Sequence, residues 1–188
     1  MANIILVDMD GVLCDFEQAF LDCWRTSFPE KPFIQIPDRR TPYLSDQYPP
    51  EEYDNIYKMW QRPRFFADLP EIPHGVAALK EMDAMGWDVR ICTSPMRRYE
   101  HCAPEKFEWI EARFGHAWVD KIILTRDKTM VRGDILIDDM PNIKGSYPTL
   151  YTHIIYDQPY NREVTHRPRL TWANWREVMD KVLSEKSK

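Results

Sequence analysis

The sequence lacks the features that mark several large classes of protein. Only four of its 188 residues are cysteine, and no two of them are spaced closely enough to form the ligand pairs of a zinc site. No apolar run approaches the length of about 20 residues that crosses a membrane. The first apolar segment begins too close to Met1 to leave room for a signal peptide. We therefore expect a cytoplasmic protein with reduced cysteines in its core.

Positive charge is also in short supply. The chain has 25 Lys and Arg residues against 30 Asp and Glu residues, which gives a formal net charge of -5. Binding to a nucleic acid polymer or to an anionic membrane depends on a surplus of basic side chains, so neither is expected as a partner. A small phosphorylated molecule is compatible with this charge, because a few cations suffice to bind it.

What the sequence does have is the composition of a globular protein with one sizeable core. Hydrophobic residues make up 44% of the chain and charged residues 29%. Proline is abundant from residue 30 to residue 73, which argues against a central sheet there. Apolar side chains recur at helical spacing over residues 16–28 and 51–60. We assign residues 16–73 to a small helical cap, and residues 1–15 and 74–188 to the core.

A short apolar run at residues 4–7 ends in two carboxylates, Asp8 and Asp10, and is followed by Gly11. An unbroken Ile/Leu/Val run fits a strand that is covered on both faces, and ligands of parallel sheets bind beyond the carboxyl ends of the strands. Two such carboxylates repel each other unless a cation or a shared proton lies between them. The pair also fits a helix N-terminus or a solvated turn, but its position after a buried strand favours metal-assisted chemistry.

Strands alternate with helices through the rest of the chain. Further strands are expected at residues 88–93, 121–125, 135–137 and 153–156. Helices are expected at residues 76–85, 104–114 and 172–182. This alternation predicts an α/β fold, with a parallel sheet flanked by helices and joined by right-handed crossovers.

Polar residues follow four of the expected strands. They are Asp8 with Asp10, Thr93 with Ser94, Arg126 with Lys128, and Asp138 with Asp139. Carboxylates are hard ligands that suit Mg2+, which commonly bridges to a substrate phosphate; the hydroxyl and the cations would hold that phosphate. Singly, each group has a structural alternative, in which Thr93 ends a strand, Lys128 is a solvated cation and Asp138 caps a turn. Their convergence at one edge of the sheet favours a metal and phosphate site.

These residues resemble the motifs of the haloacid-dehalogenase-like (HAD) phosphohydrolases, whose first motif is Asp-x-Asp-Gly-Val. The first motif stands here as Asp8-Met9-Asp10-Gly11-Val12. The chain is closer still to the 5'(3')-deoxyribonucleotidase branch, and the resemblance covers nearly its whole length. The segments that carry it are Asp15-Phe16-Glu17, Ile91-Cys92-Thr93-Ser94-Pro95, Leu124-Thr125-Arg126-Asp127-Lys128-Thr129 and Leu136-Ile137-Asp138-Asp139. The resemblance implies a Rossmann-like core, a helical cap after the first strand, Mg2+ and hydrolysis of nucleoside monophosphates.

The chemistry of such a site can be assigned to single groups. Asp8 is the candidate nucleophile, because it follows the strand directly and is held rigidly for in-line attack on phosphorus. Asp10 would protonate the leaving sugar oxygen and then, once ionised, activate the water that hydrolyses the aspartyl-phosphate. Mg2+, Thr93 and Lys128 would offset the charge on the transferring group. The resemblance also implies that Asp8, the backbone carbonyl of Asp10, and Asp139 hold the metal.

Two of these assignments have rivals. Asp138 is expected to support the metal site indirectly, but the sequence also allows it to be the direct ligand in place of Asp139. Lys106, near the start of its helix, is the alternative to Lys128 as the phosphate-binding lysine.

The resemblance places three aromatic residues of the cap, Phe16, Tyr43 and Trp60, around the nucleobase. Flat bases bury well against aromatic faces, so stacking is the physical basis of this assignment. The alternative is that these side chains form the cap's own core. The segment Met96-Arg97-Arg98 departs from the family pattern, in which a less basic stretch is more usual, and this leaves the base preference open.

Two other functions fit part of the sequence. A HAD-type phosphatase that acts on another small phosphorylated metabolite would share the core and use the cap aromatics only for packing. A non-catalytic domain similar to a response-regulator receiver also combines acids with a Thr and a Lys, but its phospho-accepting Asp lies on a middle strand and it has no inserted cap. The sequence leaves open the base and sugar, the choice between 5' and 3' phosphate, and the oligomeric state, for which a homodimer is one candidate.

Overall fold

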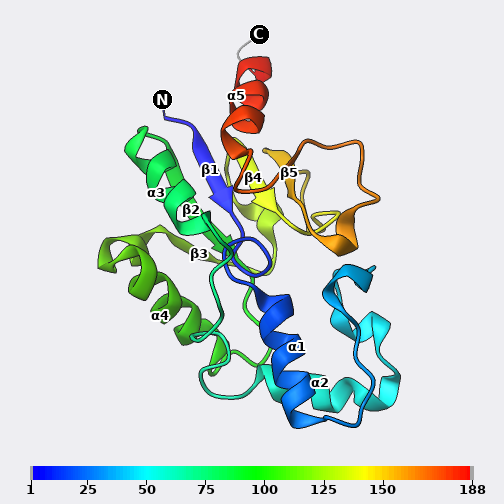
Figure 1. The fold of residues 1–188 in the computed structure, drawn as a ribbon. Coiled ribbons are helices and arrows are strands. Elements are labelled where there is room, and N and C mark those ends of the chain that lie inside the picture. Colours follow the sequence, from blue (N-terminus) through cyan, green and yellow to red (C-terminus); the bar gives the residue numbers. More distant parts are fainter. Residues whose placement is uncertain (1, 187–188) are drawn as a thin grey trace.

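The computed structural model describes residues 2–186 and has a six-stranded sheet at its centre (Figure 1). All paired strands are parallel, and their order is β3-β2-β1-β4-β5-β6. The strands are β1 (Ile4–Val7), β2 (Asp88–Thr93), β3 (Ile122–Leu124), β4 (Ile135–Asp138), β5 (Thr152–Tyr156) and β6 (Arg169–Leu170). The predicted parallel sheet is confirmed, and β1, which carries the first acidic motif, lies near its middle.

Each helix expected from the sequence is present, with small shifts at its ends. The α-helices are α1 (Phe16–Ser27), α2 (Tyr53–Trp60), α3 (Gly75–Ala84), α4 (Cys102–Phe114) and α5 (Trp175–Lys186). The start of α1 has a local cause, because the Asp15 carboxylate accepts a hydrogen bond from the Gln18 backbone N–H at 3.0 Å and so caps the helix. The edge strand β6 is not foreseen, because two residues are too few to show a periodic pattern.

The central strand β1 is buried on both faces, as its unbroken apolar run predicts. Ile5 and Val7 pack into the main core, to which α3, α4 and α5 also contribute. Leu6 points to the opposite face, where it packs with Cys92 and Leu136. Burial of one such aliphatic side chain contributes about 1.5–3 kcal/mol, so the apolar run holds the acids that follow it at a rigid strand end.

The segment between β1 and α3 has a smaller hydrophobic cluster of its own. Helices α1 and α2 lie together beyond the carboxyl end of β1, at the bottom of Figure 1. The buried members of this cluster are Phe20, Trp24, Leu44, Tyr48, Ile56 and Met59. Farther along, Phe66, Leu69 and Ile72 belong to the main core instead. The last part of the expected cap therefore packs with the sheet domain.

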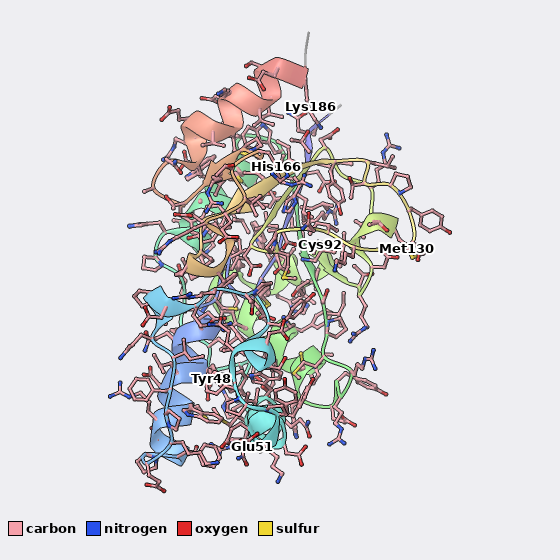
Figure 2. All side chains as sticks on the ribbon, turned by 90° about the vertical axis from the view of Figure 1, so that its right-hand side faces the viewer. Tyr48, Glu51, Cys92, Met130, His166 and Lys186 are labelled. Atoms are coloured by element: carbon pink, nitrogen blue, oxygen red, sulfur yellow. The ribbon has the colours of Figure 1, made fainter. Side chains whose placement is uncertain are left out.

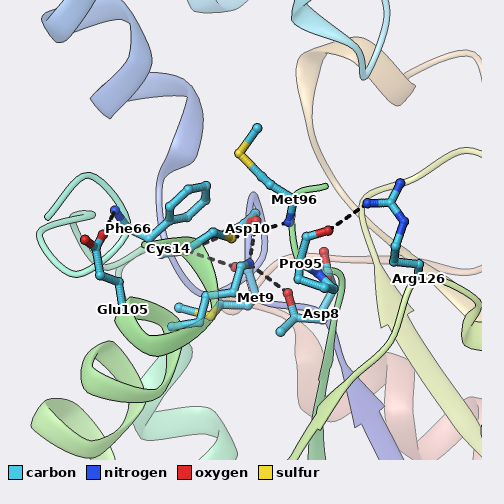
Figure 3. Close-up of polar contacts among 12 residues, drawn as sticks. Asp8, Met9, Asp10, Cys14, Phe66, Pro95, Met96, Glu105 and Arg126 are labelled. Carbon is cyan, nitrogen blue, oxygen red and sulfur yellow. Dashed lines mark hydrogen bonds and ion pairs between the residues drawn. The ribbon is translucent and has the colours of Figure 1, made fainter. Parts of the chain in front are cut away.

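Two buried carboxylates hold this segment at its beginning and at its end. Glu17 of α1 accepts from Arg39 Nε at 2.6 Å, and both side chains are buried. Glu105 of α4 accepts the backbone N–H of Phe66 at 2.9 Å and that of Arg64 at 2.5 Å (Figure 3). Removing one partner of a buried ion pair costs about 3–5 kcal/mol, so the Glu17–Arg39 pair strongly holds the first part of the cap together. Glu105 ties the last part of the cap segment to α4.

The four cysteine thiols are free. Cys92 lies in the interior in Figure 2, whereas Met130 projects from the surface and is 68% exposed. Cys23 is only partly buried, and Arg62 Nη1 lies 3.2 Å from its sulfur, so the expectation of a core thiol does not hold for this residue. Within residues 2–186, no helix is both long enough and apolar enough to cross a membrane.

Candidate active site

The polar strand ends meet at one edge of the sheet, as predicted. They line a hollow of about 380 Å3, the strand-end hollow, together with Phe16 and Tyr43. Asp8 directly follows β1, Thr93 ends β2 and Asp138 ends β4, and these three strands are neighbours. Parallel strands bring their carboxyl ends to the same edge, so residues far apart in the sequence share this hollow.

Lys128 joins two carboxylates in the strand-end hollow. Its Nζ lies 2.6 Å from Asp8 Oδ1 and 2.6 Å from Asp138 Oδ2, and all three residues are buried. Burial favours a neutral amine, but the two carboxylates outweigh it and raise the pKa of Lys128 above its usual value. The ammonium therefore stays charged and holds the Asp8 carboxylate in one position.

Lys106 pairs with Asp10, the other acid of the first motif. Its Nζ lies 2.6 Å from Asp10 Oδ2 and donates to Thr93 Oγ1 at 2.9 Å. Burial again favours the neutral amine, but the Asp10 carboxylate outweighs it, and the pKa of Lys106 is raised. Cys14 approaches from the other side of Asp10, with its sulfur 3.4 Å from Oδ1 (Figure 3). The two lysines that are rivals in the sequence thus pair with different carboxylates.

Asp139 is held by a segment that the sequence does not single out. The Tyr160 hydroxyl donates to Asp139 Oδ2, and Asn161 Nδ2 donates to the Asp139 backbone carbonyl at 2.7 Å. Gly11 packs directly against this pair, and its φ is +73°. A Cβ at this position would lie 2.9 Å from the Tyr160 oxygen and 3.0 Å from Asp139 Oδ2. Gly11 is therefore needed for its backbone conformation and for this close approach.

Three carboxylates of the hollow form a group that fits a metal ion. Asp8, Asp138 and Asp139 are buried, and each offers one oxygen within 4.8 Å of the others. Three carboxylates and the Lys128 ammonium leave a formal charge of -2, which suits a divalent cation. Burial raises the pKa of Asp138 to about 6. Burial, followed by the charges of Asp138 and Asp8, raises the pKa of Asp139 well above its usual value.

The fit of these carboxylates to Mg2+ follows from their charge and their chemistry. Burial disfavours the ionised acids, and a bound cation offsets this cost. The donors are hard oxygens, the ligands that Mg2+ prefers. Asp138 has both oxygens engaged, because Oδ2 accepts from Lys128 and Oδ1 accepts from the Met140 N–H at 2.9 Å. Asp8 and Asp139 are therefore the freer carboxylates of the three.

The three aromatic residues expected at the nucleobase line two adjoining hollows and lie in different settings. Tyr43 is 54% exposed and lines the strand-end hollow. Phe16 lines the same hollow and packs against both hydrophobic clusters. Trp60 lines a neighbouring hollow, and its ring lies 5.8 Å from that of Phe16. Phe16 and Trp60 therefore combine cap packing with access to a hollow.

Several side chains of the strand-end hollow were not expected there. Glu17, to which the sequence gives no role beyond its place in the segment Asp15-Phe16-Glu17, lines the hollow together with Tyr160. Arg39 links the two, because its guanidinium pairs with Glu17 and lies 5.8 Å from the Tyr160 ring centroid. The lining also includes Pro42, Met140, Asn142, Ile143 and Lys144. Apart from Glu17, nothing in the spacing of these residues relates them to the motifs, so only the fold brings them to the site.

Comparison with known proteins identifies the family of this chain. Its residues 2–188 match the family described as 5' nucleotidase, deoxy (pyrimidine), cytosolic type C protein. The chain belongs to this family. A Homo sapiens relative, the cytosolic type 5'(3')-deoxyribonucleotidase, is 42% identical over 94% of this chain and 92% of its own length. The mitochondrial 5'(3')-deoxyribonucleotidase of Homo sapiens is 41% identical over 94% of this chain and 82% of its own.

Solved structures agree on the fold. A HAD family hydrolase from Deinococcus radiodurans, crystallised with bound phosphate and sodium, superposes with a TM-score of 0.60 over 96% of each chain, at 15% identity. The predicted α/β fold with its HAD-like core is thus confirmed, as are the predicted family and the predicted enzyme class, a phosphomonoesterase.

Proposed function

We propose that this family member is a Mg2+-dependent nucleotidase that removes the 5' or 3' phosphate of deoxyribonucleoside or ribonucleoside monophosphates through an aspartyl-phosphate. The observation that supports this best is the separate pairing of the two acids of the first motif. Asp8 is held by Lys128 and Asp10 by Lys106, each at 2.6 Å. Two carboxylates with separate, fixed partners can perform separate tasks in one reaction.

In the proposed mechanism Asp8 attacks phosphorus. Lys128 orients the carboxylate and helps to offset the negative charge on the transferring group, because its Nζ is fixed in the hollow. The Thr93 hydroxyl also lines the hollow, where it accepts from Lys106, the partner of Asp10, and it is the second phosphate donor. Attack breaks the bond between phosphorus and the sugar oxygen and leaves the phosphoryl group on Asp8.

Asp10 handles the protons in both halves of the reaction. It donates a proton to the departing sugar oxygen, and as a carboxylate it then accepts a proton from the water that hydrolyses the intermediate. Lys106 holds the Asp10 side chain and is itself held by the Thr93 hydroxyl, which accepts from its Nζ. One residue can serve both steps because the leaving oxygen and the attacking water occupy the same side of the phosphorus.

The metal would be held by Asp8, the Asp10 backbone carbonyl and Asp139, with Asp138 supporting them indirectly. The two occupied oxygens of Asp138 support this division of roles. When bound, Mg2+ would supply positive charge that offsets the negative charge of the transferring phosphoryl group.

The cap would provide substrate selection. Phe16, Tyr43 and Trp60 form an aromatic wall beside the phosphate site, and stacking on such a wall is tolerant of base identity. In this proposal residues 16–73 act as the cap, and residues 1–15 and 74–188 as the catalytic core. The cytoplasmic location and the homodimer stay predictions.

A turnover assay over deoxyribonucleoside and ribonucleoside 5'- and 3'-monophosphates, with and without Mg2+, tests the proposed function. Sugar phosphates and p-nitrophenyl phosphate serve as comparison substrates. We expect hydrolysis that requires the metal and favours nucleotides over sugar phosphates. Equal or greater efficiency on sugar phosphates would instead support the alternative, a HAD-type phosphatase of another small metabolite.

A further inference from the structure

A second hollow opens beside the strand-end hollow, between α2 and the loop that follows β2. This cap-side hollow has a volume of about 790 Å3. It shares Tyr43, Ser94 and Arg126 with the strand-end hollow, so the two are continuous. Tyr57 and Trp60 of α2 also line it, so it contains the Trp60 end of the aromatic wall. A ligand whose phosphate lies at Asp8 can therefore extend into the cap-side hollow.

The lining of the cap-side hollow is strongly cationic. Lys58, Arg97, Arg98 and Arg126 all line it, whereas Asp54 is its only acidic lining residue in the described part of the chain. Four cations and one carboxylate give a formal charge of +3 in a protein whose net charge is -5. Within residues 2–186 none of these four cations forms an ion pair with a carboxylate.

The arginines that do have partners bond to neutral oxygens. Arg98 Nη1 donates to Gln61 Oε1 at 3.0 Å. Arg126 Nη1 donates to the Pro95 carbonyl at 3.1 Å, and Figure 3 shows its guanidinium directed at this loop. Neutral acceptors orient a guanidinium but leave its charge available. These side chains thus line the hollow as cations without an ion-pair partner.

We propose that the cap-side hollow binds a second phosphate of the substrate, so that nucleoside 3',5'-bisphosphates are better substrates than the matching monophosphates. The inference rests on the proposed function. The common nucleobases are uncharged at neutral pH, so the phosphates are the anionic groups of a nucleotide. With one phosphate at Asp8 and the base on the aromatic wall, a second phosphate on the sugar is the group that matches these cations. Guanidinium groups suit phosphate because they can donate two parallel hydrogen bonds.

The reaction on such a substrate is the proposed hydrolysis at one end only. The ester bond of the phosphate at Asp8 breaks, and water supplies the oxygen that completes inorganic phosphate. The sugar oxygen leaves with a proton, and the product is a nucleoside monophosphate that retains the second phosphate. The cations of the cap-side hollow take no part in bond breaking; they bind the group that stays.

The test compares kcat/KM for thymidine 3',5'-bisphosphate with kcat/KM for thymidine 5'- and 3'-monophosphate, in Mg2+ at low ionic strength. We expect the bisphosphate to be favoured. The double variant Arg97→Gln, Arg98→Gln should lower the bisphosphate-to-monophosphate ratio by about five- to tenfold, because one exposed ion pair is worth up to about fivefold. Arg132→Gln is the matched control, since Arg132 is an exposed arginine outside both hollows, and should leave the ratio unchanged.

A second measurement uses salt. Exposed charges are screened over about 10 Å at 0.1 M ionic strength, so the preference for the bisphosphate should shrink as salt is added.

Hydrolysis of monophosphates without any preference for the bisphosphate would overturn this inference and leave the proposed function intact, as would a preference that survives the double variant. Failure to hydrolyse any nucleotide would overturn both. Greater efficiency on thymidine 5'-diphosphate than on the 3',5'-bisphosphate would place the second anion next to the first and would also contradict the inference.

Discussion

The strand-end hollow and the cap-side hollow differ in how their charges are held. In the strand-end hollow Asp8, Lys128 and Asp138 are at most 7% exposed, and Lys128 pairs with each of the two carboxylates at 2.6 Å. In the cap-side hollow Tyr57 is 46% exposed and Arg97 is exposed without an ion-pair partner. Buried charges must be paired because desolvation is costly, and pairing fixes their geometry. Exposed charges carry no such requirement.

This contrast corresponds to two functions, catalysis and substrate recognition. In-line attack on phosphorus requires groups that hold one position, since small misplacement costs much of the advantage of proximity. Recognition of different bases or of additional anions is better served by exposed aromatic faces and long cationic side chains. We therefore expect substitutions in the strand-end hollow to affect all phosphomonoesters, and substitutions on the cap side to affect nucleotides selectively. The predictions below test this division.

The largest effect is expected for Asp8→Asn. The amide is nearly isosteric but is no nucleophile, so turnover of every phosphomonoester should fall by about a thousandfold or more. The fold should persist, because the change removes a negative charge from a group of three buried carboxylates and Lys128 keeps its partner Asp138. Circular dichroism and the melting temperature check the fold, and steady-state kinetics in saturating Mg2+ check the activity. Retention of most of the activity would remove Asp8 from the role of nucleophile.

Asp10→Asn should cause the next largest loss. General acid–base catalysis typically contributes about 10^2- to 10^4-fold, and the loss should be near the upper end for nucleotides, whose sugar oxygen is a poor leaving group. An activated aryl phosphate should lose less, since its leaving group needs no proton. Asp15→Asn is the matched control, because Asp15 lies five residues away and caps α1, a role that asparagine also fills. Equal losses on both substrates would show that Asp10 has another main role.

Trp60→Ala should have a smaller and selective effect. A lost base stack costs about 1–3 kcal/mol, or about ten- to a hundredfold in kcat/KM for nucleotides, while p-nitrophenyl phosphate should lose little. Trp60→Phe should recover much of the nucleotide efficiency, because a phenyl ring keeps a stacking face. Trp60 also packs against Phe16 and Tyr57. An equal loss on both substrates, together with a lower melting temperature, would therefore assign Trp60 to the cap core.

The smallest effect concerns how strongly Mg2+ stabilises the protein at different pH values. The pKa of Asp138 is raised to about 6, and that of Asp139 is raised as well. A raised carboxyl pKa means that the metal-free folded state binds more protons than the unfolded state, so its stability falls as pH rises from about 4 through about 6. Mg2+ competes with these protons. The increase in melting temperature on adding Mg2+ should therefore be a few degrees larger near pH 7.5 than near pH 5.

The control for this prediction is the variant Asp139→Asn. It should lose most of the Mg2+-induced increase in melting temperature at both pH values, because a proposed ligand is gone. If Mg2+ raised the melting temperature of the unsubstituted protein equally near pH 5 and near pH 7.5, the carboxyl groups with raised pKa values would not be those that bind the metal.

Local sequence patterns were sufficient to predict the elements and the strand-end acids. The apolar run at residues 4–7 predicts a strand buried on both faces, and Ile5, Leu6 and Val7 are indeed fully buried. The alternation of strands and helices predicts a parallel sheet, and the rule that ligands bind at the carboxyl ends of its strands brings Asp8, Thr93 and Asp138 together. The two-residue strand β6 and the short turn around Tyr160 leave no such pattern.

The sequence by itself determined which polar groups follow the apolar strands, because those strands are visible as local apolar runs. Only the tertiary structure decided which of these groups pair. Lys106 meets Asp10 across 96 residues of sequence, and Lys128 meets Asp8 across 120. Glu17 meets Arg39 inside the cap, and Asp139 meets Tyr160 beyond β5. Such partners are selected by the packing of whole elements and by the cost of leaving a buried charge unpaired, and neither leaves a periodic trace in the chain.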